Sequence, residues 1–134
     1  MVSNGNGVFK MEVDSGKKVL IAFAEGFFSM EQGLAFTEAF IDAAHKVSKY
    51  GDYSLVIDAK GVKPSTPDVS QALGKAMALY VSDDFIFRKR FMTKLTSAIA
   101  QVQVERLAKG IPGFSSKATF VDSKEEALKM LKSI

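Results

Sequence analysis

Cysteine is absent from this sequence of 134 residues, and histidine occurs only once. Without cysteine the chain can form no disulfide, no thiolate metal site and no thiol nucleophile. The single histidine, His45, cannot supply a metal site with several imidazole ligands, and no serine motif accompanies it, so we interpret it as a residue on the surface of a helix. The sequence thus predicts no metal, no cofactor and no enzymatic centre.

Long apolar runs are missing as well. No stretch approaches the roughly 20 residues of a membrane-spanning helix, so we expect no transmembrane segment. Residues 1–7 are polar and rich in glycine and asparagine, unlike the apolar centre of a signal peptide, and we expect them to be disordered. The expectation is therefore a cytoplasmic protein in which residues 8–134 form one domain, long enough to fold without a disulfide or a metal.

A strong net charge is also absent, because 18 Lys and Arg against 15 Asp and Glu leave a formal charge of +3. The distribution is uneven: residues 1–87 hold 8 basic against 11 acidic residues, whereas residues 88–134 hold 10 against 4. A basic C-terminal third is compatible with an anionic partner, but a solvated, lysine-rich surface is the simpler interpretation. The low total charge and the lack of a recognised motif argue against a nucleic-acid partner.

Hydrophobic patterning indicates an α/β protein. Residues 8–14 alternate between apolar and polar side chains and residues 18–24 are almost continuously apolar, which predicts an antiparallel hairpin with an interior second strand. A helix is predicted from Ser29, with Gln32 in the capping-box position, to Gly51. The remaining predicted elements are a strand at 53–59, a helix that begins at Pro67 behind Thr66, a strand at 117–121 and a last helix capped by Ser123.

The segment 88–110 admits two interpretations. Its apolar residues would line one face of a continuous helix, yet residues 91–97 also alternate as a strand that is followed by a helix at 98–109. We choose the strand and then the helix, because this continues the alternation of strands and helices. The predicted fold is a single α/β domain with a mixed, mostly parallel five-stranded sheet, an N-terminal antiparallel hairpin and about four helices.

Several short sequence motifs, in their order along the chain, resemble those of a known superfamily. They are Glu25-Gly26, Leu55-Val56-Ile57-Asp58, Gly61-Val62, and Phe120-Val121 followed by Glu126-Ala127-Leu128. From about Phe9 to Leu131 the chain resembles the STAS superfamily, and within it the SpoIIAA-like bacterial branch of anti-sigma-factor antagonists. The resemblance implies a mixed sheet with stacked βα turns, and a role in binding rather than in catalysis.

The resemblance also implies a phosphorylation site, and here the sequence departs from the pattern. Phosphoregulated members carry an Asp-Ser-Ser-Gly-like element at the start of the helix after the third strand, and its serine accepts the phosphate. The corresponding stretch reads Lys63-Pro64-Ser65-Thr66-Pro67-Asp68, with Pro67 about where the acceptor serine would fall. Ser65 and Thr66 remain as candidate phosphate acceptors, although capping the helix is the role we expect for them.

Polar residues follow the predicted parallel strands at the edge where α/β folds usually bind ligands. This strand-end edge consists of Glu25, Asp58, Thr96, Ser97 and Asp122. Three neighbouring acids there could coordinate magnesium through oxygen ligands. We favour the structural alternative, because Asp122 precedes a capping serine and Asp58 can bond nearby backbone amides where its strand meets a loop.

Residues 85–91 combine aromatic and basic side chains just before a predicted strand. Phe85, Phe87, Arg88, Lys89 and Arg90 are candidates for contact with a partner protein or an anionic surface. The alternative, which we favour, buries the phenylalanines in the core and leaves the cations in water.

The apolar strands point to a binding function. They require both faces of the central sheet to be covered, whereas the resemblance puts most helices on one side. The other face then needs a second subunit, the N-terminal segment or an apolar ligand, which eleven Phe and six Met could surround. The leading hypothesis is a non-catalytic module that recognises a protein partner of unknown identity and forms a homodimer. The alternative is a small carrier for an apolar or lipid-like ligand held between sheet and helices, and an enzyme that uses the strand-end carboxylates is the weakest hypothesis.

Overall fold

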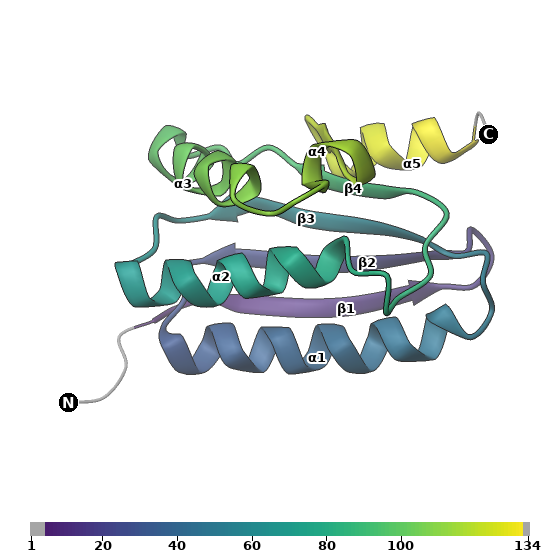
Figure 1. Ribbon diagram of the computed structural model, residues 1–134, viewed down its shortest axis with the longest axis horizontal. Coiled ribbons are helices and arrows are strands. Elements are labelled where there is room, and N and C mark those ends of the chain that lie inside the picture. The colour runs from purple at the N-terminus through teal and green to yellow at the C-terminus, as the bar shows by residue number, and fades with distance from the viewer. Residues whose placement is uncertain (1–4, 133–134) are drawn as a thin grey trace.

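Five strands form one sheet in the computed structural model, which describes residues 5–132 (Figure 1). The strands are β1 (Val8–Asp14), β2 (Val19–Gly26), β3 (Ser54–Val62), β4 (Arg90–Thr93) and β5 (Thr119–Val121). The helices are α1 (Met30–Ser48), α2 (Pro67–Tyr80), α3 (Ala98–Lys109), the single turn α4 (Phe114–Lys117) and α5 (Lys124–Lys132). None of the helices described is both long and apolar enough to cross a bilayer.

The strands lie side by side in chain order, β1-β2-β3-β4-β5. β1 pairs antiparallel with β2, and the other neighbouring strands are parallel. Successive right-handed crossovers in one direction put their helices on the same side, so α1, α2 and α3 share one face of the sheet, which we call the helix face. The predicted mixed sheet, its N-terminal hairpin and the strand-then-helix interpretation of residues 88–110 are confirmed.

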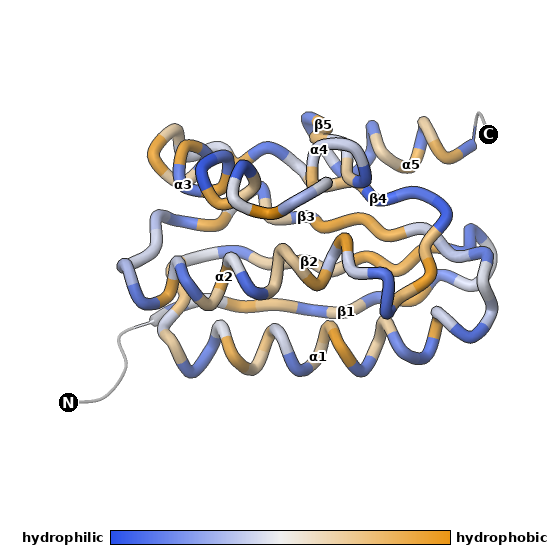
Figure 2. Tube along the Cα trace, in the orientation of Figure 1, coloured by the Kyte–Doolittle hydropathy of each residue, from blue (hydrophilic) through white to orange (hydrophobic). Residues whose placement is uncertain are grey.

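The opposite side of the sheet, which we call the far face, is covered by α5. Its apolar strand residues pack with the fully buried Ala127 and with Leu128 and Leu131; they are Val19, Ile21, Val56, Phe91 and Val121. Figure 2 shows how hydrophobic residues concentrate in β2 and β3, while α1 and α2 alternate between hydrophobic and hydrophilic. The chain's own last helix thus supplies the cover for which the sequence suggested a second subunit, the N-terminal segment or a ligand.

Gln32 joins the N-terminal segment to the start of α1. Ser29 Oγ accepts the Gln32 N–H at 3.2 Å and Gln32 Oε1 accepts the Ser29 N–H at 3.1 Å, which is the predicted capping box. Gln32 Nε2 also donates to the carbonyls of Gly5 and Gly7, at 3.3 and 3.1 Å. Of the segment 1–7 that we expected to be disordered, residues 5–7 are therefore held against α1, and residues 1–4 lie outside the described residues.

Several boundaries differ from those the sequence predicts. β3 continues to Val62 because it pairs with the end of β2, through Glu25 with Gly61 and Gly26 with Val62. α1 ends at Ser48, and Gly51, with φ of 76°, lies in the turn beyond it instead of capping it. β4 has only four residues. The sequence pattern misses α4, because a single helical turn is too short to show a period.

The pairing of β3 with β4 ends at a buried threonine. The main-chain register runs as far as Ile57 with Met92. Beyond this point the Ala59 N–H donates to Thr93 Oγ1 at 2.9 Å. Thr93 is fully buried, so the hydroxyl is the acceptor that this backbone amide needs in place of water.

Replacing Thr93 by valine should lower the free energy of unfolding by about 1–3 kcal/mol, because the side chain keeps its shape while the buried Ala59 N–H loses its acceptor. Urea unfolding followed by circular dichroism measures the change. Thr93→Ser keeps the hydroxyl and is the matched control, with only the smaller loss from a missing methyl group. Equal unfolding free energies for wild type and Thr93→Val would contradict the role assigned to this hydrogen bond.

Candidate functional site

A narrow pocket lies between the helix face of the sheet and helices α1 and α2. Buried apolar residues from every surrounding element form its walls, among them Phe36, Ile57, Ala76, Met92 and Val104. Half-buried residues mark its opening, namely Gly33, Thr37, Ser65, Ala72 and Leu73. Its volume is about 60 Å³. This is less than half of a cavity of about 150 Å³ that holds benzene.

Small residues on the facing helices keep this space open. At Gly33 of α1, apart from its chain neighbours and the backbone of its own helix, no atom lies within 4 Å of the position that a Cβ would occupy. Ala72 and Ala76, one turn apart on α2, line the pocket from the other helix. Ala76 is buried, whereas Ala72 is half-buried at the pocket. Larger side chains at these positions would fill the gap between the helices.

Three of the lining residues carry hydroxyl groups. Thr37 Oγ1 donates to the Gly33 carbonyl at 3.0 Å within α1. The backbone of Ser65 is held by Gln103, whose Oε1 accepts its N–H at 2.9 Å and whose Nε2 donates to its carbonyl at 3.0 Å. Burial raises the pKa of Tyr80 far above its ordinary value of 10.0, so this phenol stays protonated at neutral pH. The lining contains no carboxylate, amine or imidazole.

The candidate phosphate acceptors, Ser65 and Thr66, precede α2 as the sequence predicts, and Pro67 occupies its first position. Thr66 stands at the N-cap, but its hydroxyl donates to the Asp68 carboxylate at 2.6 Å and accepts no backbone N–H. The capping role expected for the Thr66 side chain is therefore wrong, because the charged carboxylate is a stronger partner than a backbone amide. The same hydrogen bond lowers the pKa of Asp68 below its ordinary value of 3.8.

The acids of the strand-end edge do not form a metal site. Within residues 5–132, no three acidic or histidine side chains gather closely enough to hold a metal ion, so Glu25, Asp58 and Asp122 do not build the magnesium site that the sequence allowed. Asp122 instead forms an exposed ion pair with Lys94 at 3.5 Å. Its charge is thus balanced by a neighbouring strand end.

The two hydroxyl residues of that edge take part in local structure. Ser97 Oγ accepts the Ala100 N–H at 3.2 Å and caps α3. The backbone N–H of Thr96 donates to the Lys60 carbonyl at 2.9 Å, which fastens the β4–α3 loop to the end of β3. Both residues thus contribute to the local structure around the start of α3.

The aromatic residues of segment 85–91 are buried. Phe85 is 3% exposed, and Phe87 is 7% exposed and lies beneath the Arg90 guanidinium, 5.6 Å from the ring centroid. Both phenylalanines are core residues, so they form no contact surface for a partner or an anionic membrane. Of the five candidate contact residues, only Arg88 and Lys89 are exposed, while Arg90 is half-buried.

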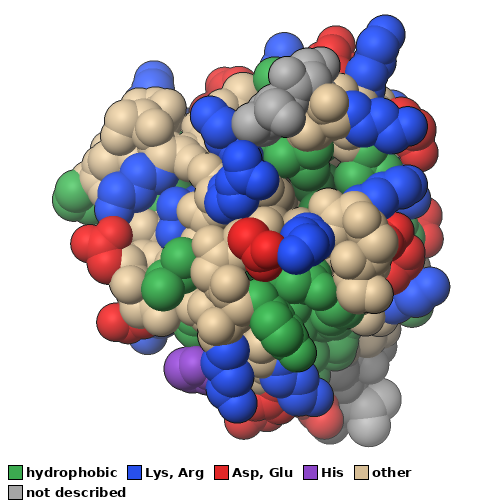
Figure 3. All heavy atoms as spheres, turned by 90° about the vertical axis from the view of Figure 1, so that its right-hand side faces the viewer, with side chains coloured by type: hydrophobic (Ala, Val, Ile, Leu, Met, Phe, Trp, Pro, Cys, Tyr) green, Lys and Arg blue, Asp and Glu red, His purple; other side chains and the backbone are tan. Residues whose placement is uncertain are grey.

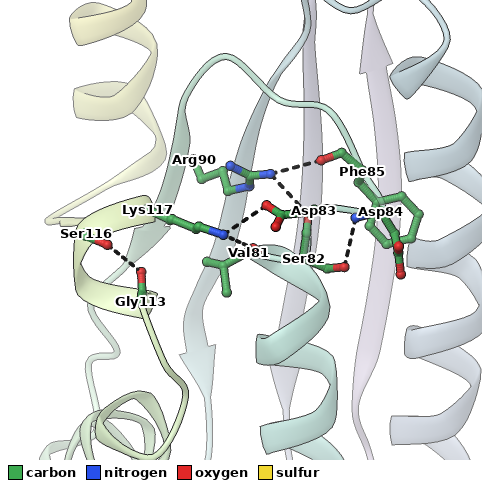
Figure 4. A network of polar contacts seen from close by, with 9 residues as sticks. All are labelled: Val81, Ser82, Asp83, Asp84, Phe85, Arg90, Gly113, Ser116 and Lys117. Atoms are coloured by element: carbon green, nitrogen blue, oxygen red, sulfur yellow. Dashed lines mark hydrogen bonds and ion pairs between the residues drawn. The ribbon is translucent and has the colours of Figure 1, made fainter.

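Arg90 and Lys117 bind the loop that precedes β4 to the rest of the fold (Figure 4). Arg90 Nη2 donates to the Phe85 carbonyl at 3.0 Å. Lys117 Nζ donates to the Val81 carbonyl at 3.3 Å and to the Asp83 carboxylate at 3.0 Å. Burial lowers the pKa of Arg90, and its Nε is buried without a hydrogen bond. These contacts account for Arg90 as a structural residue.

Acid should weaken the contact between Asp83 and Lys117. The Lys117 ammonium lowers the pKa of Asp83 below its ordinary value of 3.8, so the stabilisation is fully present above that pH and is lost as the pH falls through the lower, folded-state value. Asp83→Asn should therefore lose less unfolding free energy than wild type between about pH 5 and pH 2, as measured by urea unfolding at each pH. The difference should be small, because the Asp83 side chain is 94% exposed.

Asp84→Asn is the matched control for this measurement, because the Asp84 side chain makes no ion pair with another described residue. It should follow the wild-type pH dependence. The same dependence in Asp83→Asn would refute the contribution of the ion pair.

Basic residues are mixed with acidic ones on the surface. Figure 3 shows Lys and Arg interspersed with Asp and Glu on the end of the molecule that lies at the right of Figure 1. Lys18 pairs with Asp52, which raises the pKa of Lys18 and lowers that of Asp52. His45 is exposed on α1, as the sequence predicts. This end of the molecule offers no continuous basic patch to an anionic partner.

The architecture is that of a SpoIIAA-like α/β domain, with a mixed five-stranded sheet between two helical layers. It is similar to the crystal structure of an uncharacterized protein of the DUF3478 family, described as having a SpoIIAA-like fold, from Shewanella loihica PV-4. The two chains share 17% identity over 98% of each, with a TM-score of 0.58. No family model and no curated protein matches the sequence. The structural similarity establishes the fold that the sequence resemblance implies.

Proposed function

We propose that the protein is a non-catalytic binding module that carries a small apolar molecule between the sheet and helices α1 and α2. The observation that carries this proposal is the apolar pocket left open by Gly33 and Ala72. An apolar molecule that enters it removes both its own surface and that of the walls from water, which is favourable in free energy. The lining supplies no acid or base pair that would transform such a molecule.

The size of the pocket limits the ligand. A volume of about 60 Å³ is too small for a benzene ring unless the helices move apart. A slender alkyl chain places one end in the pocket and leaves the remainder at the opening beside Thr37 and Ser65. The ligand class is therefore a narrow, flexible hydrocarbon chain rather than a fused-ring compound.

Pentane is a probe for the pocket because it is apolar and slender. Titration of the wild-type protein should shift the amide NMR signals of lining residues such as Phe36 and Ala76. Gly33→Leu should abolish these shifts, since its side chain extends into the space that a Cβ enters freely. Gly33→Ala is the matched control: it should still bind pentane, and it should raise the free energy of unfolding by up to about 1 kcal/mol through helix propensity.

Wild-type spectra that do not change with pentane would contradict a ligand in this pocket, as would equal shifts in Gly33→Leu. Native mass spectrometry of protein purified without detergent gives the mass of any natural ligand directly. The ligand mass should be present for wild type and Gly33→Ala and absent for Gly33→Leu.

Recognition of a protein partner is the second candidate, and exposed apolar residues on α3 favour it. Ile99 and Val102, one turn apart, are 67% and 51% exposed. Apolar side chains three residues apart on a helix are neighbours and form a small apolar patch. A second copy of the chain is the partner that can be tested directly.

The double variant Ile99→Ser with Val102→Ser should convert a self-associating protein into monomers, because it removes the apolar surface of the patch. Sedimentation equilibrium measures the mass of wild type and variant. Leu34→Ser, which alters a residue on α1 that is 54% exposed, is the matched control and should sediment as wild type does. A wild-type protein that stays monomeric at high concentration would exclude self-association through α3.

A further inference from the structure

Tyr80 is the most deeply buried hydroxyl residue on the wall of the pocket. It is 3% exposed, and its ring packs edge-on against Phe40 with 5.0 Å between centroids. Among residues 5–132 its hydroxyl has no hydrogen-bond partner, in contrast to Thr37, whose hydroxyl is bonded within α1. The hydroxyl oxygen is not among the fully buried polar atoms that lack a partner, so it keeps accessible surface and a hydrogen-bond partner from outside the protein can reach it.

The surroundings of Tyr80 define what that partner can be. The other lining residues are apolar apart from the hydroxyls of Thr37 and Ser65, so the phenol is one of three hydroxyl groups in an otherwise hydrocarbon lining. The phenol is protonated and therefore donates. No lysine, arginine or histidine lines the pocket, so a carboxylate placed beside Tyr80 would lose its hydration without gaining a counter-charge.

We propose that Tyr80 donates a hydrogen bond to a neutral oxygen acceptor on the bound molecule, so that the pocket selects slender apolar molecules with a carbonyl, ether or hydroxyl oxygen near the buried end. This inference rests on the proposed binding of an apolar ligand in the same pocket. It assigns the ligand class as a neutral aliphatic ketone, aldehyde, ester or alcohol rather than a fatty-acid anion.

The test is a cycle of two changes, one in the protein and one in the probe. Methyl propyl ketone and pentane have the same carbon chain and differ in the acceptor oxygen. Their dissociation constants, from amide NMR titration, are compared for wild type and Tyr80→Phe. The variant should bind the ketone about three- to tenfold more weakly, as expected for one neutral hydrogen bond, while its affinity for pentane stays unchanged or rises.

Three further measurements test the role of Tyr80 and the ligand class. Because its hydroxyl has no partner in the protein, Tyr80→Phe should not lower the melting temperature of the unliganded protein. Tyr53→Phe removes a hydroxyl from another buried tyrosine outside the pocket and should change neither affinity. Pentanoate, the charged analogue, should bind wild type more weakly than the ketone does.

Each outcome decides between the two proposals. If pentane binds wild type but Tyr80→Phe does not weaken ketone binding, the role of Tyr80 is overturned and the apolar pocket stands. If neither probe binds wild type, the pocket and this inference fail together. A melting temperature clearly lowered in Tyr80→Phe would show that the hydroxyl serves the fold, and tighter binding of pentanoate than of ketone would overturn the neutral ligand class.

Discussion

Burial of both faces of the central strands is the constraint on which the rest of the structure depends. Val19 and Leu20 are adjacent in β2 and both fully buried, and since their side chains point to opposite faces, each face needs its own cover. On the helix face that cover is α1, α2 and α3, and on the far face it is α5 with its buried Ala127. Because one chain supplies both layers, the central strands are buried without a second copy.

The same requirement for close packing means that the open pocket lowers the stability of the protein. At about 24 cal/mol for each Å³ left unfilled, a gap of about 60 Å³ corresponds to roughly 1.5 kcal/mol of lost stability. Gly33, in the first turn of α1, costs up to about 1 kcal/mol more relative to alanine. A chain that keeps a glycine and the small Ala72 at this opening forgoes stability that larger residues would provide. The apolar ligand that we propose would restore part of it by stabilising the folded state.

The order of strands and helices can be predicted from the sequence because its signals act over a few residues. Ser29 with Gln32 marks the start of α1, and Pro67 marks the start of α2. The pocket cannot be predicted in this way, because it depends on the sizes of side chains on different helices. In the sequence Gly33 is an isolated helix glycine and Ala72 one core alanine among several, and the space appears only when the fold brings their helices together.

The strand-end edge and the pocket beneath α1 and α2 differ in the polar contacts that their residues already make. At the edge, Ser97 caps a helix and Asp122 pairs with Lys94, so a ligand that used these two side chains would exchange existing contacts for new ones. Between the helices, a ligand removes apolar surface from water and breaks no protein hydrogen bond. A charged molecule would gain nothing comparable there, because the walls offer no opposite charge to replace its hydration. The ligand site that we propose therefore lies in the interior of the helix face and not at the usual ligand edge of an α/β fold.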